Sequence, residues 1–123
     1  MNNLYESGEM YLETILMLTN QQGSVRSIDI VREMGFSKPS VSVGMKKLKE
    51  GNYISIDSEG YITLTDSGYK VAQKVFERHT ILTGVLEKIG VSPKTAQEDA
   101  CKIEHIISDE TFSRIKEYIE HGN

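Results

Sequence analysis

The chain lacks several features that define large classes of protein. It has no tryptophan, two prolines and a single cysteine among its 123 residues. One cysteine cannot form an intrachain disulfide, which excludes the disulfide-stapled secreted domains and fits a reducing compartment. No apolar run reaches the length that spans a bilayer, and no basic-then-apolar signal segment is present. We therefore expect a cytoplasmic protein without a membrane partner.

The motifs of common enzyme classes are missing as well. The sequence has no glycine-rich phosphate loop, no nucleophile–base pairing and no substantial lid. The remaining enzymatic alternative is a small metalloenzyme, in which a glutamate and a histidine beside a metal activate water. We expect that the protein is not an enzyme.

The net charge of −4 argues against a nucleic-acid binder, but its distribution does not. Residues 24–50 carry six basic and three acidic side chains, a local charge of +3 that leaves −7 for the other 96 residues. Such an asymmetry indicates one face that meets a polyanion and an acidic body elsewhere.

Hydrophobic periodicity predicts a first helix over residues 4–22 and two short helices after it. Ser27 is predicted to cap the first of these short helices. A turn containing Gly35 follows, and Ser37 then caps a helix that has Pro39 in its first turn. Two short helices joined by a tight glycine-bearing turn form the helix-turn-helix layout.

In this layout the N-terminal part of the second helix enters the major groove of double-stranded DNA. Small and basic side chains there suit bonds to phosphates and contact with thymine methyl groups. The alternative is a plain helical hairpin inside a bundle, but exposed small residues followed by lysines favour DNA. The candidate DNA-contacting residues are Arg26, Ser37, Lys38, Pro39, Ser40, Ser42, Val43, Lys46 and Lys47.

Two alternating runs, 53–56 and 61–64, are separated by a turn and predict a β-hairpin. A hairpin directly after the second helix of such a unit is a wing. Glu59 lies at its tip and repels phosphate, so we expect the wing to add little affinity. Residues 1–75 are predicted to form a winged helix-turn-helix DNA-binding domain.

Three further helices are predicted at 66–89, 93–107 and 109–121, with no flexible linker before them. The apolar stripe of the middle one continues to Ile106 and Ile107. The fold class is therefore mainly α, an N-terminal winged helix-turn-helix followed by a helical domain. Because the last helices are few and apolar, a C2 homodimer is expected to bury their surface.

One segment near the C-terminal end, Asp99-Ala-Cys-Lys-Ile-Glu-His105, combines three metal-ligating residue types. If it is helical, Cys101, Glu104 and His105 share one face at i, i+3 and i+4. A thiolate, a carboxylate and an imidazole can hold a divalent metal. The alternative is a small buried cysteine beside two solvated polar side chains. Spacing alone leaves both open.

The order of elements and several motifs resemble the diphtheria-toxin-repressor family of iron- and manganese-dependent repressors, over nearly the whole chain. The likeness is to the short members without a C-terminal barrel domain. It implies a dimeric, metal-dependent repressor that binds palindromic operators and controls metal homeostasis, with a metal-binding and dimerisation domain at 76–123. The motifs that carry it are Glu9-Met-Tyr-Leu-Glu13, Ser37-Lys-Pro-Ser-Val-Ser42, Leu64-Thr-Asp-Ser-Gly68, Arg78-His79 and the segment ending at His105.

The resemblance also implies a primary metal site. In the iron branch its ligands match Met10, Cys101, Glu104 and His105. The manganese branch has carboxylates at the first two of these positions. Because thioether and thiolate ligands favour softer, later metals than carboxylates do, the resemblance implies Fe(II), with Mn(II), Co(II), Ni(II) or Zn(II) as competitors.

A second metal is left open by the resemblance. Of the iron branch's ancillary ligands only His79 matches, since Thr83 and Gln97 stand at the other helical positions. The manganese branch uses a glutamate–histidine pair that matches Glu13 and His79, with Glu104 shared.

This ligand set divides between the two predicted domains, so a metal would couple the dimerisation half to the DNA-binding half. The spacing of the two recognition helices, about 34 Å or a multiple, would then depend on the metal. The alternative function is a metal-independent winged-helix regulator controlled by a small organic ligand or a protein partner.

Overall fold

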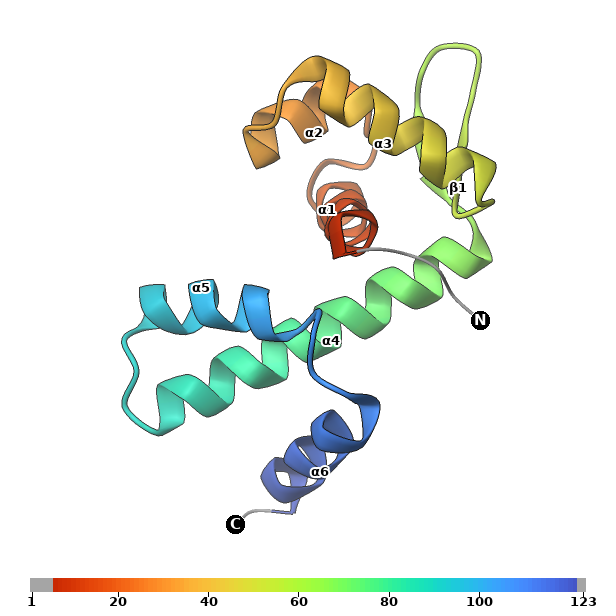
Figure 1. The fold of residues 1–123 in the computed structure, drawn as a ribbon. Coiled ribbons are helices and arrows are strands. Elements are labelled where there is room, and N and C mark those ends of the chain that lie inside the picture. Colours follow the sequence, from red (N-terminus) through yellow and green to blue (C-terminus); the bar gives the residue numbers. More distant parts are fainter. Residues whose placement is uncertain (1–5, 122–123) are drawn as a thin grey trace. The chain divides into compact units, whose positions relative to one another are not determined.

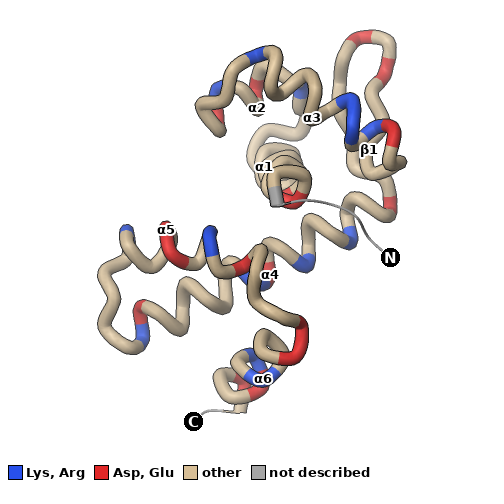
Figure 2. Tube along the Cα trace, in the orientation of Figure 1, with Lys and Arg blue, Asp and Glu red and all other residues tan. Residues whose placement is uncertain are grey.

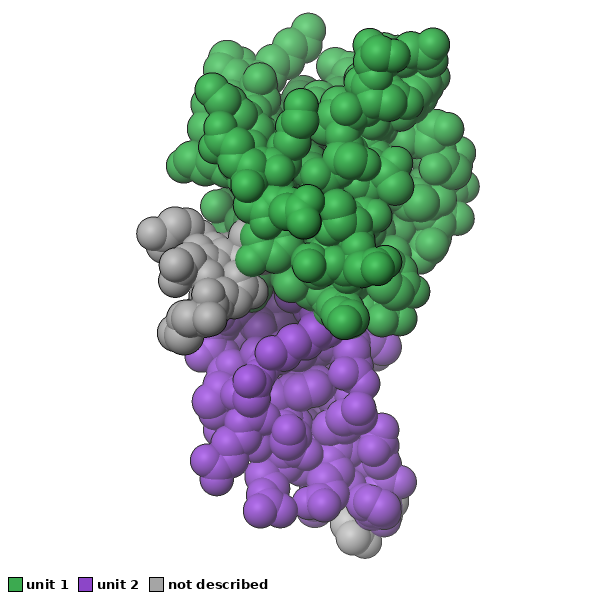
Figure 3. Space-filling model, turned by 90° about the vertical axis from the view of Figure 1, so that its right-hand side faces the viewer, with its two compact units in different colours: residues 1–73 green, residues 74–123 purple. Residues whose placement is uncertain are grey.

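The structure, a computed structural model, describes residues 6–121 and is mainly α-helical there, as the sequence predicts (Figure 1). Residues 4 and 5 of the expected first helix lie outside the described residues. The chain divides into two compact units, residues 1–73 and 74–123, which we call unit 1 and unit 2 (Figure 3). The elements in order are α1 (Glu6–Gln22), α2 (Ser27–Met34), α3 (Lys38–Glu50), β1 (Ile54–Ile56), β2 (Ile62–Leu64), α4 (Asp66–Lys88), α5 (Pro93–Ile103) and α6 (Asp109–Glu120).

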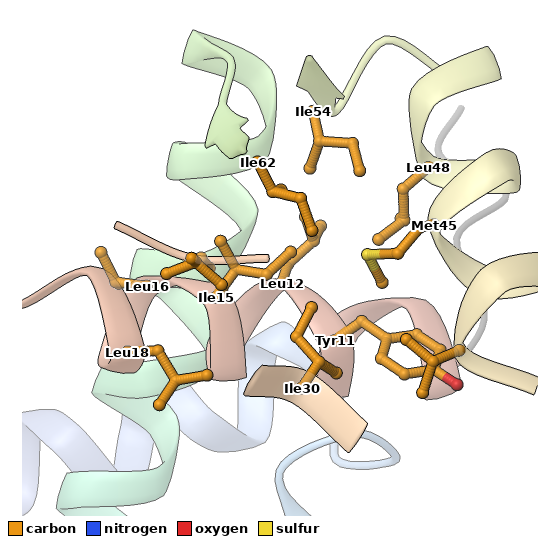
Figure 4. Close-up of a cluster of buried hydrophobic side chains, with 13 residues drawn as sticks. Tyr11, Leu12, Ile15, Leu16, Leu18, Ile30, Met45, Leu48, Ile54 and Ile62 are labelled. Atoms are coloured by element: carbon orange, nitrogen blue, oxygen red, sulfur yellow. The ribbon is translucent and has the colours of Figure 1, made fainter. Parts of the chain in front are cut away.

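The core of unit 1 is formed by apolar side chains from α1, α2, α3 and both strands, which point toward one another (Figure 4). Their three- and four-residue spacing in the helices places one apolar stripe of each helix on this core. Each large side chain buried in this way contributes about 1.5–3 kcal/mol of hydrophobic free energy. Members of the cluster include Leu12, Ile15, Ile30, Val41, Met45, Leu48, Ile54 and Ile62.

The two short helices of unit 1 begin at different kinds of cap. Ser37 caps α3 as predicted, because its Oγ accepts a hydrogen bond of 3.2 Å from the Ser40 N–H. The predicted cap of α2 is wrong: Ser27 is already helical, and the N-cap is Arg26. The Asp29 carboxylate accepts the backbone N–H of Arg26 at 2.8 Å, which satisfies the N–H of the capping residue itself.

The wing is a two-stranded antiparallel hairpin with Ile54 opposite Leu64. Each strand is one residue shorter at its start than expected. The Asp57 carboxylate closes the turn by accepting the N–H groups of Glu59 and Tyr61, both at 2.9 Å. Gly60 follows with φ +89°, a conformation that favours glycine.

Unit 2 contains most of α4 and the whole of α5 and α6. α4 ends at Lys88, and α5 begins with Pro93 in its first turn as predicted. No helix in the described part of the chain is both long and apolar enough to cross a membrane.

The prediction that α5 continues to residue 107 is wrong, because α5 ends at Ile103. The Ile103 carbonyl accepts the N–H groups of both Ile106 and Ile107 at 3.0 Å, which closes a turn in place of another helical step. Ser108 must then be extended, since its Oγ caps α6 by accepting the Thr111 N–H at 3.1 Å. The chain therefore leaves the helix four residues earlier than its apolar pattern indicates.

Candidate metal centre and nucleic-acid interface

The end of α5 and the turn after it bring three ligand-type side chains together. The thiol of Cys101, the carboxylate of Glu104 and the imidazole of His105 each offer a ligand atom, and these atoms lie within 4.8 Å of one another. Glu104 keeps right-handed helical dihedrals, φ −59° and ψ −24°, although the helix has ended. Its side chain therefore stays on the same side of the chain as Cys101.

Glu104 is buried, with 1% of its surface exposed. Its Oε1 lies 2.7 Å from Nδ1 of His79, which is on α4 in the same unit. Among the described residues, Oε2 of Glu104 is buried and has no hydrogen-bond partner. A buried carboxylate is costly unless it is paired, hydrogen-bonded or bound to a metal. This oxygen is therefore placed where a cation would compensate the cost of burial.

The donor set of this cluster fits a divalent transition metal. A thiolate, a carboxylate and an imidazole combine soft, hard and intermediate ligand character, which suits the later first-row metals. Metal binding requires the deprotonated forms of these groups. Cys101, Glu104 and His105 would hold such an ion, and its charge would compensate the burial of the Glu104 carboxylate.

The other predicted metal-site residues belong to other elements of the chain. Met10 and Glu13 are partly buried on α1, which belongs to unit 1. Thr83 lies one turn after His79 on α4, and its hydroxyl is buried without a hydrogen-bond partner in the described part of the chain. Gln97 is exposed on α5. Unit 2 thus brings together four of the six predicted ligands.

Arg78 is a residue of this centre to which sequence reasoning gave no role. It is 7% exposed and donates to the backbone carbonyls of Glu104 at 3.2 Å and Ile107 at 2.8 Å. It also pairs with the Asp109 carboxylate. The available signal was its position: Arg78 continues the buried stripe of α4, three residues after Val75, where an apolar residue is expected.

Asp109, the first residue of α6, forms ion pairs with two basic side chains. Lys74 lies 3.0 Å from its Oδ1, and Arg78 contacts the same oxygen. The hydrogen bond and charge of Lys74, followed by the charge of Arg78, lower the pKa of the Asp109 carboxyl below its ordinary value. The start of α6 is thereby fixed to α4 within unit 2.

The candidate DNA-contacting surface is the side of α3 that faces away from the core. Val41, Met45 and Leu48 are buried on one side of the helix. The opposite side is exposed, and Val43 keeps 55% of its surface exposed. Figure 2 marks the basic residues at both ends of α3. The outward residues are Pro39, Val43, Lys46 and Lys47.

The remaining predicted DNA-contacting residues have different surroundings. Lys38 and Ser42 are exposed, and Ser37 and Ser40 are exposed but hydrogen-bonded to each other at 2.9 Å between their hydroxyl oxygens. Arg26 is engaged by the wing. Its guanidinium lies 4.9 Å from the centre of the Tyr61 ring and donates to the carbonyl of Glu59.

Two family models match the chain. One is described as the N-terminal DNA-binding domain of iron-dependent repressors and covers residues 3–62. The other is the metal-binding and dimerisation domain of iron-dependent repressors and covers residues 65–123.

Individual proteins are similar over most of the chain. An uncharacterised helix-turn-helix-type transcriptional regulator of Methanocaldococcus jannaschii is 33% identical over 117 residues, which are 94% of each protein. The transcriptional regulator MntR of Salmonella typhimurium is 34% identical over 113 residues, 91% of this chain and 72% of that protein. A solved manganese-dependent transcriptional repressor in complex with manganese superposes with a TM-score of 0.83 at 26% identity. That match covers 92% of this chain and 52% of the solved one, so this chain spans about half of its length.

Proposed function

Because the chain belongs to the iron-dependent repressor family, whose members are metal-dependent DNA-binding transcriptional regulators and not enzymes, we propose that it is an Fe(II)-preferring repressor. In this proposal it acts in the cytoplasm as a homodimer, binds palindromic operators and controls metal homeostasis. The observation that carries the metal dependence to this chain is the buried Glu104 carboxylate, which lies with Cys101 and His105 and has one unpartnered oxygen.

The proposed primary ligands are Met10, Cys101, Glu104 and His105. Two of them are sulfur ligands, and sulfur ligands favour Fe(II) and the later metals over Mn(II). The manganese-dependent repressor with a similar structure makes Mn(II) the competing ion. Co(II), Ni(II) and Zn(II) are further candidates because they share the affinity for thiolate and imidazole.

A second metal is proposed for Glu13 and His79, with Glu104 shared. His79 already contacts Glu104 Oε1 at 2.7 Å, which supports the histidine–glutamate part of this set. Thr83 and Gln97 do not belong to it, because a neutral hydroxyl and an amide are weak ligands.

Regulation is proposed to work by a shift between conformations. The proposed ligands come from α1, which belongs to the DNA-binding unit, and from α4, α5 and the turn after α5. A divalent ion supplies the positive charge that holds such anionic and neutral ligands together. Only a difference in metal affinity between the DNA-competent form and the other forms can drive this shift. Activation should weaken at acid pH, because protons compete for the ligands.

The proposed DNA contact places α3 in the major groove, with Pro39, Val43, Lys46 and Lys47 on its outward side. Lys38, Ser40 and Ser42 support it near the start of the helix, where Ser37 caps the first turn. Arg26 contributes through the wing that its guanidinium holds.

The test is an anaerobic DNA-binding titration with Fe(II), Mn(II), Co(II) and Zn(II) on the wild type and on Cys101→Ser. We expect Fe(II) to activate binding at a lower free concentration than Mn(II), and the variant to lose that preference. Lys102→Ala, an exposed change on the same helix, serves as the control and should behave as the wild type.

Two results would contradict the proposal. Activation by Mn(II) at a lower free concentration than by Fe(II) would overturn the Fe(II) preference. Absence of heat in calorimetric titrations with Fe(II), Co(II) and Mn(II) would overturn the metal dependence of this chain and favour regulation by an organic ligand or a protein partner.

A further inference from the structure

Two of the clustered ligand-type residues lie outside regular secondary structure. α5 ends at Ile103, so Glu104 and His105 belong to the turn that leads to α6. Inside a helix, successive backbone hydrogen bonds would fix the direction of their side chains. In this turn the Ile103 carbonyl accepts two N–H groups, and the carbonyls of Glu104 and Ile107 need donors from elsewhere.

Arg78 supplies those donors. Its Nη1 donates to the Glu104 carbonyl at 3.2 Å and to the Ile107 carbonyl at 2.8 Å. These two acceptors lie at the two ends of the turn, with His105 between them. One guanidinium therefore holds the backbone on both sides of a proposed ligand.

The second terminal nitrogen and the planar face of the guanidinium have contacts as well. Nη2 pairs with the Asp109 carboxylate at the start of α6, and the guanidinium carbon lies 5.2 Å from the centre of the Phe112 ring. Arg78 is 7% exposed. A planar group with several donors in fixed directions holds such an arrangement better than a lysine ammonium, which is a single compact charge.

The neighbour of Arg78 in the sequence holds the same glutamate by its side chain. His79 Nδ1 lies 2.7 Å from Glu104 Oε1. Two consecutive residues of α4 thus fix Glu104, Arg78 at its backbone carbonyl and His79 at its carboxylate.

We propose that Arg78 is a positioning residue for the metal centre. It fixes the turn of residues 104–107 so that the Glu104 and His105 side chains are pre-arranged with Cys101, and it does not itself contact the ion. This inference rests on the proposed metal site and adds to it a determinant of affinity outside the ligands.

Lys74 offers a matched control. Its Nζ lies 3.0 Å from the same Asp109 oxygen that Arg78 contacts, and its side chain is 58% exposed. Lys74 shares with Arg78 the ion pair at Asp109, whereas the bonds to the turn carbonyls come from Arg78. Comparing the two separates the ion pair from the support of the turn.

The experiment measures binding of Co(II), a spectroscopic probe, to the full chain under anaerobic conditions. Wild type, Arg78→Lys, Arg78→Met and Lys74→Met are titrated while the visible absorption bands of Co(II) are recorded. Loss of groups that orient metal ligands typically costs 10- to 100-fold in affinity. We expect a loss of about this size for both Arg78 variants, with changed Co(II) bands, and a change below about twofold for Lys74→Met.

Circular dichroism establishes which variants are folded before metal is added. Arg78→Lys keeps the charge and most of the aliphatic stem, so it still tests the positioning role if Arg78→Met does not fold. A folded Arg78→Lys protein with wild-type Co(II) affinity and wild-type bands would overturn the positioning role. A lowered melting temperature with unchanged affinity and bands would also overturn it, because Arg78 would then be merely structural.

The outcome for the wild type separates this inference from the proposed function. If the wild type binds no Co(II), the metal site itself is wrong and the inference falls with it. If the wild type binds Co(II) and the Arg78 variants bind equally well, the inference alone is wrong.

Discussion

His79 and Glu104 meet at 2.7 Å between Nδ1 and Oε1, and this contact joins α4 to the turn after α5. It occupies one oxygen of a carboxylate that is 1% exposed. The other oxygen has no hydrogen-bond partner among the described residues. A buried carboxylate oxygen without a partner costs free energy unless a cation compensates it. A buried carboxylate with one unpartnered oxygen is typical of a site that binds a ligand at some cost in stability.

Glu104→Gln should therefore separate stability from metal binding. The amide is isosteric and carries no charge, so the free energy of unfolding without metal should stay unchanged or rise by about 1 kcal/mol. The increase in melting temperature on adding Co(II) should disappear. Differential scanning calorimetry with and without Co(II) measures both effects. Glu98→Gln, an exposed change on α5, is the control; a strongly destabilised Glu104→Gln protein without metal would contradict the argument.

Two glycines of α4 should respond in opposite directions to the same substitution. A Cβ at Gly68 would lie 2.0 Å from the Tyr53 carbonyl oxygen, a backbone atom that cannot move aside locally. Gly68→Ala should lower the free energy of unfolding by about 2–3 kcal/mol through overpacking. A Cβ at Gly84 meets nothing within 4 Å in the described structure. Gly84→Ala should raise the free energy of unfolding by about 0.5–1 kcal/mol, because alanine favours the helix and restricts the unfolded chain.

Urea denaturation of the two alanine variants, at one protein concentration, tests this pair. Equal effects of the same sign would show that the approach of α4 to the Tyr53 carbonyl does not limit the size of residue 68.

Asp109 should make the stability depend on pH on the acid side. Lys74 and Arg78 lower its pKa in the folded protein below the ordinary value of 3.8. A lowered folded pKa gives a stabilising contribution that is present above 3.8 and is lost as the pH falls through the folded value. Asp109→Asn should thus be less stable than the wild type near neutral pH and approach it in acid.

Denaturant midpoints measured from about pH 6 down to about pH 2 test this difference. Lys74→Met should shift the acid part of the wild-type curve toward ordinary aspartate behaviour, because the hydrogen bond from Lys74 is the largest cause of the lowered pKa. A constant gap between wild type and Asp109→Asn over the whole range would refute the electrostatic explanation.

The lysines of α3 should act on DNA without regard to sequence. Lys46→Ala should lower the affinity for operator DNA and for non-specific DNA by similar factors. It should also reduce the slope of the logarithm of the binding constant against log salt concentration by about 0.9 for each phosphate that is no longer neutralised. Lys94→Ala, an exposed change on α5, should leave the slope unchanged.

Val43→Ser on α3 should instead alter the base preference at one position of the operator while keeping the salt slope. Fluorescence anisotropy at several salt concentrations distinguishes these outcomes.

Local patterns were sufficient for most of the fold. The helix caps at Ser37 and Ser108 follow from residue type and spacing, and the hairpin follows from two alternating runs around a turn. The caps and the turn depend on neighbours within four residues in the sequence, which is the range over which capping and turn chemistry act, and the turn then aligns the two strands.

The end of α5 was not predictable in this way. Its apolar spacing continues through Ile106 and Ile107, but Ile106 is 76% exposed once the turn begins at Glu104. The donor to the Glu104 carbonyl is Arg78, 26 positions earlier in the chain. Periodicity records which residues face a core and carries no information about a side chain that reaches in from another helix. For the same reason the contacts of Arg26 with the wing were not predictable, because its partners there lie more than thirty positions away.

The exposed apolar side chains of unit 2 bear on how the protein behaves on dilution. Ile89 is 71% exposed, Ile106 76% and Tyr118 61%. If the proposed homodimer covers them, association and folding are linked by mass action, and melting temperature rises with protein concentration. In a cell that holds few copies of the chain, much of the protein would then be the less stable single protomer. The response to metal would therefore depend on how much of the protein the cell contains.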